Sequence, residues 1–89
     1  MPKQIVPSEK PDLHQQADLK LLAKMVRFKR TSLKIRLIDA ASLCGVSKQA
    51  YNNVELAVDK VRVETLFKVL NGLGIKLLIQ DKNETDEWI

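Results

Sequence analysis

Residues 37–55, LIDAASLCGVSKQAYNNVE, constrain the fold of this chain more than any other stretch. Before Gly45, apolar residues recur at three-residue spacing, which predicts a helix with a small apolar face. These residues are Ile38, Ala41 and Cys44. Gly45 can adopt the left-handed backbone that ends a helix, and Ser47 is a good N-cap for the next one. The stretch therefore predicts two short helices joined by a tight turn.

The second of these helices divides its residues between two faces. Tyr51 and Val54 are three positions apart and are expected to point inward. The outward residues are rich in amides, although Asn is a poor helix former, so an ordinary solvated face is the weaker of two interpretations. The stronger one is base reading, because Gln and Asn can bond adenine, Lys can reach guanine and an alanine methyl can contact thymine. The candidate base-reading residues are Lys48, Gln49, Ala50, Asn52 and Asn53.

The order of residues in this stretch resembles the helix-turn-helix of the Xre/lambda-Cro repressor family. The family's usual run is an Ala, a Gly-Val-Ser turn, a basic-Gln pair and a closing Glu. The matching residues here are Ala41, Gly45, Val46, Ser47, Lys48, Gln49, Val54 and Glu55. The resemblance implies DNA binding, with Glu55 as a structural brace of the motif and not a contact residue.

The resemblance covers residues 18–78. Residues 62–78, RVETLFKVLNGLGIKLL, look like the next helix and the following strand of the HipB-type antitoxin branch. This implies a mainly α fold, a four- to five-helix lambda-repressor-like domain over residues 18–80 with one C-terminal β-strand that pairs across a dimer. There are three departures from the family pattern. Leu37 stands where a Gln usually touches the DNA backbone, Ala40 where Leu is usual, and Tyr51 where Ile or Val is usual.

Length and charge are consistent with a small DNA-binding domain. A chain of 89 residues buries only about 60% of its unfolded surface, so a second copy would add stability. Residues 1–80 carry 14 basic and 7 acidic side chains, a surplus that favours a polyanion as partner. No segment is long and apolar enough to span a bilayer, and no signal peptide is visible, so we expect a cytoplasmic, nucleoid-associated protein with no membrane partner.

From the sequence we expect no cofactor, no metal site and no enzymatic activity. A single cysteine excludes an internal disulfide and a multi-cysteine zinc site, and Cys44 is interpreted as a small buried hydrophobic residue. His14 has no neighbours at ligand spacing and is expected on the surface. There is no paired set of carboxylates, no nucleophile with a His base and no Gly-rich phosphate loop.

The N-terminal half contributes charge. Residues 1–17 hold all three prolines and are predicted to form a flexible arm, and Asp18 is the expected N-cap of a helix to about residue 31. Residues 20–36 contain seven Lys or Arg and no acid, which is dense for a face that is only solvated. The candidate phosphate contacts are Lys24, Arg27, Lys34, Arg36 and, in the turn, Ser47. A purely solvated role for some of these charges is the alternative.

The C-terminal half predicts a helix and then a strand. The residues expected to pack the helix on the core are Val63, Leu66, Phe67, Leu70 and Leu73, with Gly72 and Gly74 ending it. The period then changes over residues 75–80, where the proposed dimer strand comprises Ile75, Lys76, Leu77, Leu78 and Ile79. One strand has no partner within the chain, so pairing with a second copy is the economical solution.

Residues 81–89 form an acidic tail that we expect to be flexible and that contains the only tryptophan, Trp88. HipB-type antitoxins are similar in having a terminal Trp that docks on a HipA-like Ser/Thr kinase toxin, although here Ile89 follows it. The leading hypothesis is therefore a dimeric autorepressor that binds a palindromic double-stranded DNA operator and acts as antitoxin of such a kinase. The first alternative is a stand-alone or phage-type regulator without a toxin, and the second is an adaptor that does not touch DNA.

Overall fold

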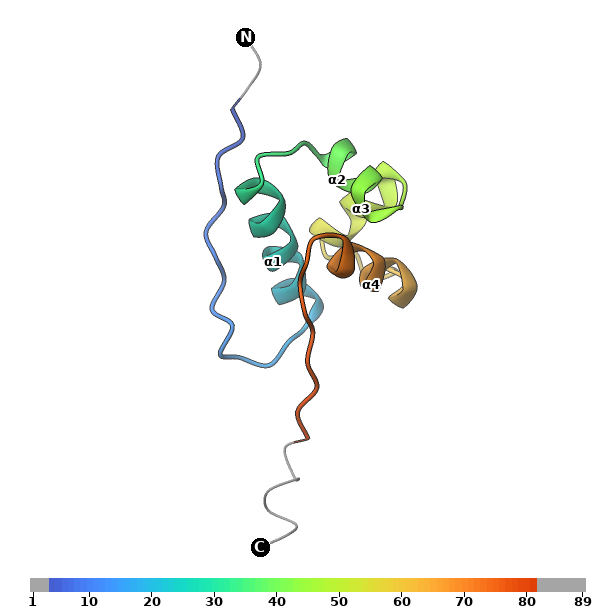
Figure 1. The fold of residues 1–89 in the computed structure, drawn as a ribbon. Helices are drawn as coiled ribbons and strands as arrows, with labels where there is room; N and C mark the ends of the chain where they lie inside the picture. The colour runs from blue at the N-terminus through green and yellow to red at the C-terminus, as the bar shows by residue number, and fades with distance from the viewer. Residues whose placement is uncertain (1–3, 82–89) are drawn as a thin grey trace, which may run out of the picture.

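The computed structural model describes residues 4–81, which form four helices (Figure 1). They are α1 (Leu19–Ser32), α2 (Leu37–Cys44), α3 (Lys48–Glu55) and α4 (Val63–Gly72). Over this described range the fold is mainly helical, as predicted, and contains no β-strand.

Two helices begin with the side-chain caps that the sequence predicts. The Asp18 carboxylate accepts a hydrogen bond from the Leu21 N–H at 2.8 Å, and the Ser47 hydroxyl accepts one from the Ala50 N–H at 3.1 Å. Each cap satisfies a backbone donor that the first turn of a helix leaves without a partner. The caps therefore fix where α1 and α3 begin.

All four helices end in the same way, with one residue in the left-handed conformation. These residues are Lys34, Gly45, Ala57 and Gly74, with φ angles of 57°, 72°, 54° and 72°. At each end two backbone N–H groups turn back onto the last helical carbonyls, for example Gly45 to Ser42 at 3.2 Å and Val46 to Ala41 at 3.0 Å. The shared turn reverses the chain sharply, and this brings short helices into contact.

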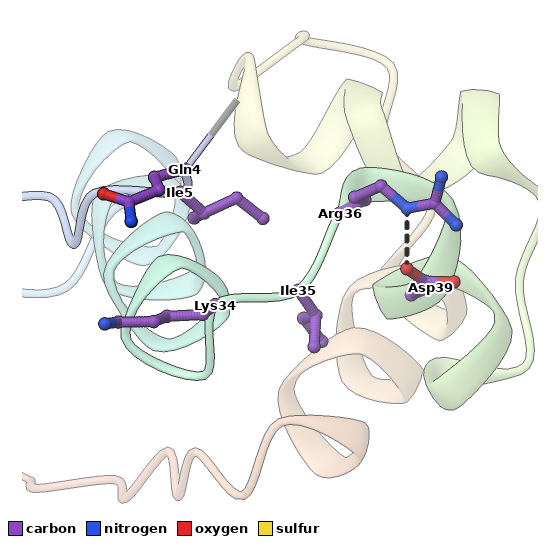
Figure 2. A pocket seen from close by; sticks show the side chains of 6 residues that line it. All are labelled: Gln4, Ile5, Lys34, Ile35, Arg36 and Asp39. Carbon is purple, nitrogen blue, oxygen red and sulfur yellow. Dashed lines mark hydrogen bonds and ion pairs between the residues drawn. The ribbon is translucent and has the colours of Figure 1, made fainter. Parts of the chain in front are cut away.

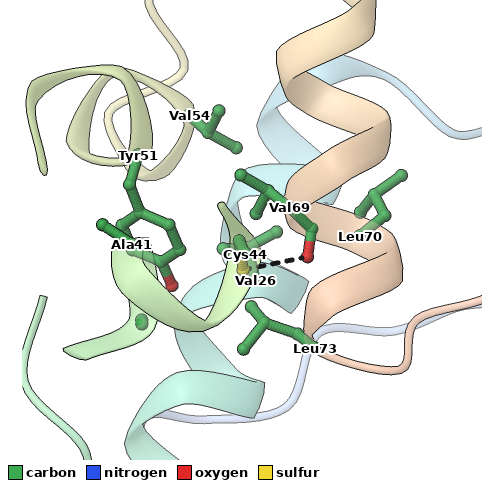
Figure 3. Packing of buried hydrophobic residues seen from close by; sticks show 9 residues of the cluster. Val26, Ala41, Cys44, Tyr51, Val54, Val69, Leu70 and Leu73 are labelled. Atoms are coloured by element: carbon green, nitrogen blue, oxygen red, sulfur yellow. Dashed lines mark hydrogen bonds between the residues drawn. The ribbon is translucent and has the colours of Figure 1, made fainter. Parts of the chain in front are cut away.

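One apolar cluster holds the helices together (Figure 3). Its buried members are Val26, Ala40, Ala41, Cys44, Tyr51, Val54, Val69, Leu70 and Leu73. Tyr51 and Val54 are fully buried, so the prediction that they face inward is confirmed. Because α3 contributes its inner face to this cluster, the remainder of the helix is left at the surface.

Two faces differ from the prediction. Ile38 is 51% exposed, and the buried face of α2 is formed by Ala40, Ala41 and Cys44. On α4, Val63 and Phe67 are 65% and 46% exposed. On α2 the reason is the helical period, since a run of three-residue steps drifts around the helix. On α4 the buried face is turned towards Val69, Leu70 and Leu73, which leaves Val63 and Phe67 at its edge.

Gly72 is the last residue of α4, so the helix ends there as predicted, and Gly72 also allows α2 and α4 to approach closely. A Cβ atom on Gly72 would lie 2.6 Å from Sγ of Cys44 and 2.8 Å from its Cα. Gly74 supplies the left-handed turn that ends the helix. The two glycines thus have different functions, one in packing and one in the turn.

Residues 4–17 have no regular secondary structure and lie along α1 (Figure 1). The Ser8 N–H donates to Oγ1 of Thr31 at 2.8 Å, and Thr31 is the one buried polar residue among those described. The Lys10 ammonium lies 6.0 Å from the centroid of the Phe28 ring. The arm is therefore anchored on the side of α1 that does not face the core, while its predicted flexibility stays a prediction.

The predicted strand is not formed in the described chain. Residues 75–81 have no regular secondary structure, and Leu78 and Ile79 are 83% and 96% exposed. A strand needs a neighbouring backbone to complete its hydrogen-bond ladder, and residues 4–81 of a single copy offer none to this segment. Ile75 packs against the apolar cluster, which places the start of the segment beside the core. Trp88 lies outside the described residues.

Candidate nucleic-acid interface

The outward face of α3 carries the residues predicted to read bases. Lys48 and Gln49 are exposed, and Ala50, Asn52 and Asn53 are partly exposed. All five lie on one helix of eight residues whose other side is buried by Tyr51 and Val54. A short helix with hydrogen-bonding side chains on a single face fits the major groove of B-DNA. Ser47, predicted to touch phosphate, uses its oxygen to cap α3 and keeps its hydroxyl proton available for donation.

A buried ion pair fixes the end of α3. Nε of Arg30 donates to Oε2 of Glu55 at 2.6 Å, and Nη2 donates to Oε1 at 3.2 Å. Nη1 of Arg30 donates to the Ile35 carbonyl at 2.9 Å. The side chains of Arg30 and Glu55 are only 12% and 7% exposed. One guanidinium thus joins α1, the turn before α2 and the C-terminal end of α3.

The brace role expected for Glu55 agrees with this geometry, but its partner was not identified from the sequence. Arg30 follows Ala23 by seven residues and Val26 by four, so the helical period places it on the same side of α1 as these two apolar residues. The available signal was an arginine on a core-facing position of a helix, where a charged side chain needs an acid to pair with. Such a pair, bidentate and shielded from water, holds the recognition surface in place.

The hydroxyl of Tyr51 is buried beneath α3 and has no hydrogen-bond partner among the described residues. Burial, and next the neighbouring Glu55 carboxylate, raise the pKa of Tyr51 well above its ordinary value. Tyr51 therefore stays neutral at any physiological pH. It acts as a large core residue, in a cluster where Ala40 and Ala41 leave room on α2.

At the start of α2, the side chain that is available to a ligand is that of Arg36 and not that of Leu37. Leu37 is partly buried and packs against the apolar cluster, so it does not replace the Gln that usually stands at this position. Arg36 is exposed, and its Nε donates to Oδ2 of Asp39 at 3.0 Å (Figure 2). The hydrogen bond from Arg36 holds the pKa of the Asp39 carboxyl below its ordinary value, and the same contact raises the pKa of Arg36. The sequence prediction included Arg36 but missed Asp39.

The structure does not bring all the predicted phosphate residues together. Lys34 and Arg36 border a hollow of about 440 Å³, but their side chains point to opposite sides of the turn (Figure 2). Lys24 and Arg27 line a different hollow, of about 580 Å³, between α1 and the arm. Figure 1 shows the arm and α3 on opposite sides of α1. Arg36 is thus the predicted phosphate residue placed at the start of the helix-turn-helix.

Within residues 4–81, neither Cys44 nor a cluster of acidic or histidine side chains forms a second kind of site. Cys44 is buried and its thiol donates to the Val69 carbonyl at 3.6 Å. Burial raises the pKa of this thiol, which keeps it protonated and unreactive. Residues 4–81 contain no group of three or more His, Cys, Asp or Glu side chains that could hold a metal ion. Within the same range, none of the helices is long and apolar enough to cross a membrane.

Four short helices, a capped recognition helix and a tight glycine turn before it define the class of helix-turn-helix DNA-binding proteins. The helix-turn-helix family model matches residues 26–79, which is more than half of the chain. The chain therefore belongs to this helix-turn-helix family. No curated protein matches it.

Proposed function

We propose that the protein is a sequence-specific transcriptional repressor of its own operon. The observation that carries this proposal is the exposed amide-rich face of α3, held by the Arg30–Glu55 ion pair. In helix-turn-helix complexes the second helix enters the major groove and the first crosses the DNA backbone. In this arrangement Gln49, Asn52 and their neighbours would read base edges, and Arg36 at the start of α2 would reach a phosphate.

Dimerisation would give the protein its full specificity. Residues 75–79 are mostly apolar, form no strand with the rest of residues 4–81 and are exposed towards their end. Such a segment can complete its backbone hydrogen bonds with the same segment of a second copy. Two copies related by a two-fold axis would read a palindromic operator with half-sites roughly 34 Å apart. A monomer would read only one half-site.

We further propose that the protein is the antitoxin of a HipA-like Ser/Thr kinase toxin. Support comes from the sequence resemblance over residues 62–78 and from the presence of Trp88 in the acidic tail, since tryptophans are frequent anchors at protein interfaces. The alternative is a stand-alone or phage-type regulator without a toxin. Co-purification with a kinase encoded by a neighbouring gene, lost in Trp88→Ala, supports the antitoxin, and full retention in Trp88→Ala or absence of such a gene supports the alternative.

The base-reading role is tested by Gln49→Ala on an operator selected from a random duplex library. Loss of a side chain that bonds a base edge is expected to weaken operator binding by about 1–3 kcal/mol and to leave binding to unrelated duplex nearly unchanged. Asn71→Ala is the matched control, since Asn71 is an exposed amide on α4. Equal losses on operator and unrelated DNA, measured at one salt concentration, would contradict base reading by Gln49.

A further inference from the structure

The start of α2 raises a question of how a phosphate contact is made without the usual Gln. Leu37 is packed on the apolar cluster and offers no donor. Arg36, one residue earlier, is 74% exposed in its side chain. A freely rotating arginine on a surface loses much side-chain entropy when it binds, so an exposed arginine gains affinity when a neighbour holds it in place beforehand.

Asp39 is such a neighbour. Its Oδ2 accepts from Nε of Arg36 at 3.0 Å, one helical turn along the chain. Among the described residues, Nη1 and Nη2 of Arg36 have no hydrogen bond, and Figure 2 shows both terminal nitrogens beyond the Arg36–Asp39 bond. A guanidinium bound through Nε still presents two donors, and a fork of two donors matches two oxygens of one phosphate.

We propose that Asp39 is a positioning residue for DNA binding: it holds the Arg36 guanidinium so that its terminal nitrogens bind a backbone phosphate beside α2. The proposal rests on the DNA-binding function proposed above and identifies how the Arg36 contact is built. Asp39 touches no DNA in this arrangement and acts only through Arg36. The contact of Arg36 with a phosphate would replace the one that the family's usual Gln makes and that the packed side chain of Leu37 cannot make.

Asp39 has a second effect on the affinity for DNA, which acts in the opposite direction and has to be separated from the positioning of Arg36. A carboxylate near a phosphate repels it, so removing the charge by any substitution raises affinity for DNA. Asp39→Asn and Asp39→Ala remove the same charge, but only Asn retains an oxygen that can accept from Nε of Arg36. The comparison between these two variants therefore isolates positioning from charge.

The experiment measures binding of the full chain to a short mixed-sequence duplex at low salt, since phosphate contacts do not depend on sequence. We expect Asp39→Ala to bind roughly three- to tenfold more weakly than Asp39→Asn, the range of one hydrogen bond. In the Arg36→Ala background this difference should disappear, because there is no guanidinium left to position. Arg36→Ala alone should lower the salt slope by about 0.9.

The matched control uses the other exposed ion pair of a helix start. Oε1 of Glu64, in the first turn of α4, lies 3.4 Å from Nζ of Lys68. Glu64→Gln and Glu64→Ala should bind the duplex equally well. Thermal unfolding of each variant shows whether it is folded at the temperature of the binding assay.

The outcomes are distinct. Equal binding by Asp39→Asn and Asp39→Ala overturns the positioning role while leaving DNA binding intact. A difference that persists in the Arg36→Ala background also overturns it, because Asp39 would then act through another group. Absence of salt-dependent binding by the wild-type chain overturns both the inference and the proposed function.

Discussion

At the scale of single residues, the departures from the family pattern form a consistent set. Tyr51 is larger than the usual Ile or Val, and Ala40 is smaller than the usual Leu, and both are fully buried in one cluster. The packing density of a core is kept when a larger side chain at one position is balanced by a smaller side chain at another. The exchange leaves the Tyr51 hydroxyl inside the core, without a hydrogen-bond partner among residues 4–81.

This hydroxyl makes Tyr51→Phe a substitution that should not destabilise the protein. A buried polar group without a hydrogen-bond partner costs about 1–3 kcal/mol. Removing the Tyr51 hydroxyl recovers this cost, and the gain offsets the packing contacts that are lost with the oxygen. We expect the free energy of unfolding at pH 7 to stay equal or to increase by about 1 kcal/mol. Urea denaturation followed by circular dichroism measures it, and a clear loss of stability would show that the hydroxyl is hydrogen-bonded in solution.

The same residue gives a pH dependence with a definite sign. Because the folded state raises the pKa of Tyr51 above its ordinary 10.0, the unfolded chain releases this proton first as pH rises. The stability that Tyr51 contributes is present below pH 10 and declines above it, at about 1.4 kcal/mol per pH unit. Unfolding measured from pH 9 to 11 should therefore show a steeper decline in the wild type than in Tyr51→Phe.

At the scale of helices, the sequence was sufficient to predict the caps and turns, but not which face of each helix is buried. Asp18, Gly45 and Ser47 act locally, and their side-chain chemistry determines their structure. Ile38 and Phe67 were assigned to the core by spacing alone, whereas burial depends on which neighbouring helix covers each side. The Arg30–Glu55 pair joins residues 25 positions apart. The acid that pairs with Arg30 can therefore be identified only when the fold is known.

The crossing of α2 and α4 supplies a prediction of this kind. Gly→Ala inside a helix normally stabilises it by about 1 kcal/mol, but at Gly72 the added methyl would meet the Cys44 backbone at 2.8 Å. The helices must separate, so Gly72→Ala should lower the free energy of unfolding by about 1–3 kcal/mol. Cys44→Ala in the same chain should relieve only part of this loss, because the Cα of Cys44 remains. A stabilised Gly72→Ala protein would contradict the close crossing.

At the scale of the whole molecule, the sequence prediction and the structure differ in the segment after α4. The helix-turn-helix motif and its exposed amides were visible in the sequence, because a motif is local. The strand over residues 75–80 was predicted from β-branched and apolar residues, yet its hydrogen bonds need a partner backbone. In the dimer proposed above, the oligomeric state would decide both whether this strand forms and how much of an operator the protein reads.

Leu78→Pro tests this dependence, because proline removes the backbone N–H that a strand ladder needs. Residue 78 lies beyond the last helix and is 83% exposed, so the four helices should keep their circular dichroism. We expect sedimentation to show a dimer for the wild type and for Leu78→Ala, which retains the N–H, and a monomer for Leu78→Pro. Because a monomer neutralises about half as many phosphates, its operator binding should have about half the salt slope. A wild-type monomer at high protein concentration would contradict the dimer, and a Leu78→Pro dimer would place the association elsewhere on the molecule.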